Sequence, residues 1–155
     1  MTLNFKGFDP NGVITKILLY VEDMKIMTAE DKQKLLDKLD ETHQEIRDWL
    51  GGVELEAPVY SDSGWRARDI IGHMATWDQE AARSLRAYRA GSEYEIIDLD
   101  EEETEYNQRA IDAQRALSNQ AILAEWEGAY EELRNAVQDI PIDRFPGDLL
   151  YPWGD

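Results

Sequence analysis

Apolar residues recur every three or four positions in three long stretches of this chain, which is the spacing of one buried helix face. The stretches cover about residues 28–50, 65–90 and 104–139. No segment shows the alternation of apolar and polar residues that marks a half-buried strand, and no internal repeat is present. The pattern therefore predicts an all-α protein, most simply a helical bundle.

Local signals predict where these helices begin and end. Thr28 followed by Asp31 approximates a capping box at the start of the first helix. Gly91 is a stop signal for the second helix. The third stretch is expected to pause near Ser118, a favourable N-cap residue, and then to end before Pro141.

The first 27 residues are predicted to form an extension that is separate from the bundle. Residues 13–24 carry a short amphipathic pattern, whereas residues 1–11 look irregular. We expect an N-terminal extension over 1–27 and one bundle domain over 28–155. The apolar run at 13–21 is too short to span a bilayer and lacks the basic start of a secretory signal.

Composition narrows the classes of partner. The chain has 155 residues, 43% hydrophobic and 32% charged, which is a globular balance. Its net charge of −17 repels phosphate backbones and anionic membranes, so we expect neither a nucleic-acid nor a membrane partner. The chain has no cysteine, which excludes disulfides, thiolate nucleophiles and cysteine metal ligands. By elimination, we expect a cytoplasmic protein.

The acidic run over 98–105 has a simple structural interpretation. Clustered carboxylates usually form a solvated surface, and acidic residues also favour the first turn of a helix. A calcium-type loop would need glycine-punctuated ligand spacing, which this run lacks. We therefore expect a loop and a helix start here.

The two histidines, His43 and His73, are the candidate chemical groups. His43 lies on the apolar stripe of the first helix, and His73 lies beside that of the second, one turn before Trp77. A single histidine on a helix face is often structural, so that interpretation stays open. If the two helices pack antiparallel, both imidazoles are candidates for one cavity. No catalytic triad, phosphate-binding glycine loop or HExxH motif is present.

Residues 65–78 (WRARDIIGHMATWD) resemble the second-helix signature of the DinB/YfiT-like superfamily. That group includes the metal-binding domain of mycothiol-dependent maleylpyruvate isomerases. Residues 35–43 resemble its first helix, and Tyr106-Asn107 together with 123–126 resemble the third-helix region of the ClbS/DfsB branch. The resemblance covers roughly residues 28–155.

The resemblance implies a DinB-like bundle whose metal is held by a second-helix histidine, which His73 matches, and by ligands from a fourth helix. Residues 151–155 resemble the turn that leads into that helix. We therefore expect three long helices and a short N-terminal helix, with the fourth family helix missing. Zinc or nickel and a low-molecular-weight thiol are the implied cofactors. Because catalytic zinc sites need about three protein ligands, we expect this metal site to be incomplete.

Three functional hypotheses follow. The first is a metal-dependent thiol-transfer or detoxification enzyme. The second is a ClbS/DfsB-like protective protein that binds a small molecule without a metal. The third is a truncated, non-catalytic bundle that forms a homodimer. Besides His73 as metal ligand, we expect five side chains to line a pocket. These are His43, Trp65, Trp77, Glu80 and Tyr106.

Overall fold

A computed structural model describes residues 28–61, 63–94 and 99–144, with the backbone alone at 99–104. The predicted all-α bundle is confirmed in this part of the chain. The predicted helix at 13–24, the extension over 1–27 and the expected turn at 151–155 lie outside the described residues. The elements are α2 (Ala29–Leu50), α3 (Ala67–Ala90), α4 (Leu99–Gln114), α5 (Asn119–Asp139) and a 3-10 turn (Ile142–Arg144).

Three predicted helix ends are confirmed in atomic detail. The Thr28 hydroxyl accepts a hydrogen bond from the Asp31 amide, and the Asp31 carboxylate accepts one from the Thr28 amide, which completes the capping box. The Ser118 hydroxyl accepts from the Ala121 amide at the start of α5. Gly91 ends α3 with a φ of 67°, a left-handed conformation that favours glycine.

Two helix starts differ from the prediction. α3 begins at Ala67, because Arg66 is the extended N-cap residue and its amide donates to Asp69 at 2.8 Å. α4 begins at Leu99, five residues before the predicted start at 104. Acidic residues fill positions 100–103, and negative charge stabilises the first turn of a helix. The acidic run thus belongs largely to α4.

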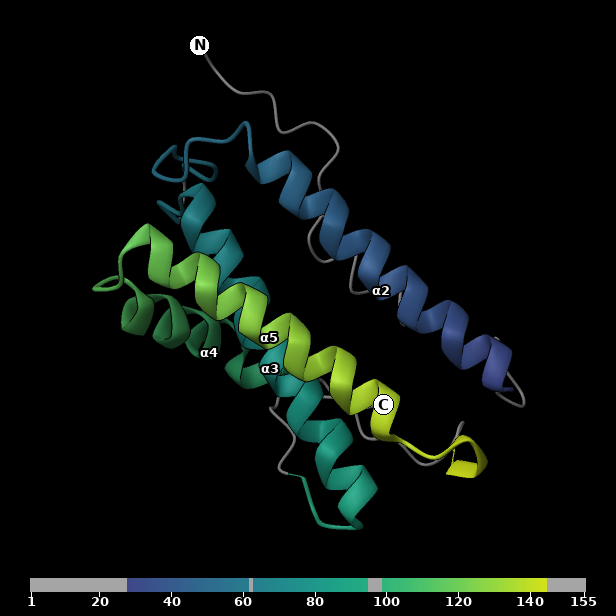
Figure 1. Ribbon diagram of the computed structural model, residues 1–155. Helices are drawn as coiled ribbons and strands as arrows, with labels where there is room; N and C mark the ends of the chain where they lie inside the picture. The colour runs from purple at the N-terminus through teal and green to yellow at the C-terminus, as the bar shows by residue number, and fades with distance from the viewer. Residues whose placement is uncertain (1–27, 62, 95–98, 145–155) are drawn as a thin grey trace.

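The arrangement places α3 and α5 side by side, with α4 beside α3 and α2 against α5 (Figure 1). Two apolar clusters fill the interfaces. One joins the end of α2 to the first halves of α3 and α5, and the other joins the start of α2 to the end of α5, so α2 is antiparallel to α5. The first cluster contains Ile46, Ile70, Ile71, Met74, Ala75, Ile122, Trp126 and Ala129.

α4 approaches α3 closely at Gly72, where the carboxamide of Gln114 occupies the space that a Cβ atom would fill. The Gln114 Nε2 donates to the Gly72 carbonyl oxygen at 3.2 Å. A Cβ at position 72 would lie 2.9 Å from the Gln114 Cδ, which is too close for atoms that are not bonded. Glycine at this position therefore permits the α3–α4 contact.

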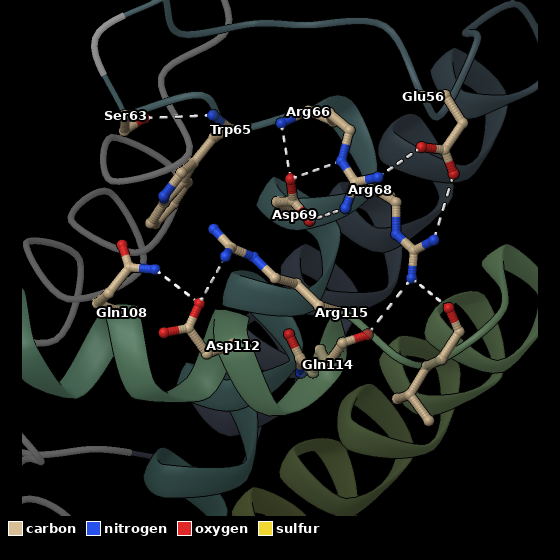
Figure 2. Close-up of polar contacts among 11 residues, drawn as sticks. Glu56, Ser63, Trp65, Arg66, Arg68, Asp69, Gln108, Asp112, Gln114 and Arg115 are labelled. Carbon is tan, nitrogen blue, oxygen red and sulfur yellow. Dashed lines mark hydrogen bonds and ion pairs between the residues drawn. The ribbon is translucent and has the colours of Figure 1, made fainter.

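Arg68, in the first turn of α3, contacts the end of α4 and the turn that follows it (Figure 2). Its buried guanidinium donates to the carbonyl oxygens of Leu117 at 2.5 Å and Gln114 at 3.4 Å, and to Glu56 at 3.2 Å. Carbonyl groups at the end of a helix lack partners within the helix. Arg68 donates to one carbonyl at the end of α4, that of Gln114, and to one in the α4–α5 turn, that of Leu117, and so holds this turn against α3.

We predict that Gly72→Ala destabilises the fold relative to a matched glycine substitution. Gly128→Ala in the interior of α5 meets nothing within 4 Å, so its expected effect is a gain of roughly 0.5–1 kcal/mol from helix propensity. Gly72→Ala must move the Gln114 carboxamide and break its bond to the Gly72 carbonyl oxygen, which should make it about 0.5–1.5 kcal/mol worse than the control. Urea unfolding measures both, and a second variant, Gly72→Ala/Gln114→Ala, should recover part of the loss. Equal effects of the two alanines would contradict the close contact.

Candidate functional site

Four ring side chains form a continuous row along one side of α3, which we call the aromatic strip: Trp65, His73, Trp77 and Tyr106. Successive ring centroids lie 5.2, 6.3 and 5.5 Å apart, and the rings are tilted or edge-to-face. The indole nitrogen of Trp77 donates to the side-chain amide oxygen (Oδ1) of Asn107 at 3.1 Å, which attaches the strip to α4. Trp77 is buried, whereas the other three rings are partly exposed.

His73 has a ring nitrogen without a hydrogen-bond partner among the described residues. This nitrogen, Nδ1, is buried. Burial lowers the pKa of His73 to about 4, so the ring is neutral at pH 7 and has one donor and one acceptor nitrogen. Nearly all buried polar atoms in proteins are hydrogen-bonded, so this nitrogen lacks a partner that the described residues do not supply, as do the Gln114 Oε1 and the Asn119 Oδ1.

Both carboxylate oxygens of Glu80, which was predicted to line the same pocket as His73, already accept hydrogen bonds. Its Oε1 accepts from the Tyr106 hydroxyl at 2.8 Å and from Arg83 at 2.6 Å, and its Oε2 accepts from the Tyr94 hydroxyl at 2.8 Å. Burial, followed by the bond to Glu80, raises the pKa of both tyrosines, so both hydroxyls stay protonated donors. The carboxylate thus positions Tyr106, the last ring of the strip.

His43 lies in a different environment. Its ring stacks on Trp126 and Tyr130 of α5 at centroid distances of 4.1 and 3.8 Å, and its Nε2 lies 2.9 Å from Glu127. Burial is the main cause of its lowered pKa. The two histidines, which were candidates for one cavity, thus have different ring neighbours: His43 stacks on α5, whereas His73 contacts the rings of the strip. The sequence spacing could not reveal this, because it does not fix the rotation of α2 about its axis.

The side chains present do not fit a transition-metal site within the described part of the chain. Here no three histidine, cysteine, aspartate or glutamate side chains come together in a way that could hold a metal ion. His73 has a free nitrogen, but the oxygens of Glu80 are taken by two tyrosines and an arginine. Zinc sites need three or four protein ligands, and one imidazole does not meet that need.

Sequence analysis missed Asp78 and Tyr94. Asp78 lies one turn after Met74 and one turn before Ala82, both of which are buried, so it interrupts the apolar face of α3. Burial raises the pKa of its carboxyl to about 7. This interruption can be read from the helical spacing. Tyr94 follows the end of α3, and nothing in the spacing indicates that it returns to Glu80.

A comparison with models of protein families identifies the family of this chain. The model of the mycothiol maleylpyruvate isomerase N-terminal domain matches residues 36–145. The chain belongs to this family. The match confirms the DinB-like resemblance that residues 65–78 carried in the sequence. No curated protein and no solved structure matches the chain significantly. None of the described helices combines the length and the apolar character that a membrane-crossing helix needs.

We predict that His73 makes the fold sensitive to acid. The folded-state pKa of about 4 lies below the unfolded value of 6.5, so this contribution to stability is complete above pH 6.5 and is lost as the pH falls toward 4. Between pH 8 and pH 5 the loss should be about 1–2 kcal/mol, since each pKa unit corresponds to roughly 1.4 kcal/mol. Urea unfolding of His73→Leu should show a shallower decline over this range, and an unchanged slope would contradict a buried neutral imidazole.

Asp78 should act in the opposite direction. Its folded-state pKa of about 7 exceeds the unfolded value of 3.8, so its contribution to stability is complete below pH 3.8 and is lost as the pH rises through 7. Asp78→Asn should therefore stabilise the protein at pH 8 by about 1–4 kcal/mol, with a smaller gain at pH 5.5. Thermal unfolding at both pH values measures this. The exposed Asp48→Asn serves as control, and equal gains for the two variants would argue against burial of the Asp78 carboxyl.

Proposed function

We propose that this chain is a DinB-like bundle that binds a small organic molecule at the aromatic strip, without a transition metal held by the described residues. The observation that carries this proposal is the unpartnered, buried Nδ1 of His73 between the rings of Trp65 and Trp77. Ligand sites are commonly lined by aromatic rings with a few polar groups that fix orientation. The strip has this composition.

The partial exposure of the strip supports the proposal. Three residues of the strip are partly exposed: Trp65, His73 and Tyr106. The fourth, Trp77, is buried. A ligand that stacks on these rings contacts the His73 ring, and it reaches the buried Nδ1 by entering between Trp65 and Trp77. The net charge of −17 supports a small molecule, in preference to a nucleic acid, as the partner.

A metal-dependent thiol-transfer or detoxification activity is the second candidate. The family name refers to a mycothiol-dependent enzyme, and the free nitrogen of His73 is a suitable first metal ligand. The donor set around it argues against this candidate, because Glu80 is committed to Tyr94 and Tyr106. A metal titration separates the two candidates.

The experiment measures binding of indole, a neutral aromatic probe, to the full chain by saturation-transfer NMR. We expect saturable binding that persists in EDTA and that His73→Ala and Trp65→Ala each weaken by about fivefold or more, as expected for loss of roughly 1 kcal/mol of contact energy. Leu117→Ala removes an exposed apolar side chain away from the strip and should leave binding unchanged.

Calorimetric titration with zinc and nickel completes the test. Tight metal binding that depends on His73, together with probe binding that requires the metal, would favour the thiol-transfer candidate. Absence of saturable indole binding, or binding that is insensitive to both strip variants, would overturn the proposed site.

A further inference from the structure

The charges around the aromatic strip restrict the kind of ligand that it can accept. Glu80 places a buried carboxylate behind Tyr106, at one end of the strip. Its ionic partner, Arg83, has a side chain that is 58% exposed, against 9% for Glu80. Solvent screens the exposed member of such a pair far more than the buried one. We therefore expect the negative charge of Glu80 to act on a ligand that binds beside Tyr106.

The four rings of the strip carry no positive charge at pH 7, and the two cations beside Tyr106 have mostly exposed side chains: Arg83, which pairs with Glu80 at 2.6 Å, and Arg109. The imidazole of His73 is neutral at pH 7, because burial lowers its pKa to about 4. Arg66, which follows Trp65, is bound by Asp69 at 3.0 Å and by Glu56 at 2.7 Å. Arg66 is thus already neutralised by two carboxylates. The net charge of the whole chain, −17, also attracts cations to the surface.

The ring faces favour the same sign of charge. Indole and phenol rings carry negative potential on their faces and attract cations, most strongly when the cation is partly desolvated. Three of the four rings of the strip are indoles or a phenol, and successive rings lie 5.2–6.3 Å apart. A planar cation can contact a ring face and place its charge toward Glu80.

We propose that the strip selects a planar organic cation, such as an amidinium or a related nitrogen cation on an aromatic body, and that Glu80 sets this charge preference. This inference rests on the proposed function, since it names the class of ligand that binds at the same strip. Glu80 acts as a specificity-determining residue through its charge, while its bonds to Tyr94 and Tyr106 keep the carboxylate in place.

Three probes of the same shape test the charge preference: benzamidine (cation), benzamide (neutral) and benzoate (anion). Their affinities for the full chain are measured by titration NMR at low ionic strength. We expect benzamidine to bind about fivefold or more tightly than benzamide, which corresponds to roughly 1 kcal/mol, and benzoate to bind most weakly.

Two variants with opposite effects separate local charge from net charge. Glu80→Gln should reduce the preference for benzamidine over benzamide by about threefold or more, whereas Glu93→Gln, an exposed glutamate with the same change in net charge, should leave it nearly unchanged. Arg83→Gln removes the exposed cation and should increase the preference. Because Arg83 lies at the surface, this variant keeps the test valid if Glu80→Gln unfolds.

The outcomes distinguish this inference from the proposed function. Equal binding of the three probes, sensitive to Trp65→Ala, would overturn the cation preference and leave the strip as a binding site. Equal effects of Glu80→Gln and Glu93→Gln would assign the preference to net charge and overturn the role of Glu80. An unchanged preference in Arg83→Gln would also overturn that role, because removal of the cation paired with Glu80 must strengthen a preference that its carboxylate sets. Absence of binding by all three probes and by indole would overturn both proposals.

Discussion

The attachment of α4 to the first turns of α3 is the contact on which the site depends. Arg68 donates to the carbonyl oxygen of Gln114, the last residue of α4, and to that of Leu117 in the following turn. The Gln114 side chain fits against the backbone at Gly72. Because a helix is stiff, fixing its last turn also sets the position of residues two turns earlier. Tyr106 and Asn107 meet Trp77 and Glu80 for this reason. The aromatic strip is thus assembled by contacts that lie outside it.

The distribution of basic residues shows how an acidic chain stabilises its helices. Within the described part of the chain, three cations donate to carbonyl oxygens at the ends of helices to which they do not belong. Lys32 donates to the end of α5, Arg68 to Gln114 at the end of α4, and Arg144 to Tyr88 near the end of α3. Positive charge at a helix C-terminus opposes the negative end of the helix dipole. These three side chains are committed to the fold, and the cations beside Tyr106, Arg83 and Arg109, have mostly exposed side chains.

Short-range signals predicted most of the fold, because caps and apolar spacing act within one or two turns. The capping box at Thr28 and the N-cap at Ser118 formed as expected. The site was harder to predict. Trp77 and Tyr106 were identified through family resemblance, and they do meet. The Glu80–Tyr94 bond and the stacking of His43 on α5 depend on helix rotation and on loop paths, which spacing along one helix does not determine.

Family membership and side-chain chemistry carry different information about this protein. A fold fixes where a second-helix histidine lies, but activity depends on the groups around it. Here the polar neighbours are paired with one another: Glu80 with two tyrosines, and Trp77 with Asn107. Replacing these partners by a metal would break bonds that position the strip. A ligand that stacks on the rings and satisfies the free nitrogen of His73 would break none of them, so the existing hydrogen bonds favour binding of a small molecule over recruitment of a metal.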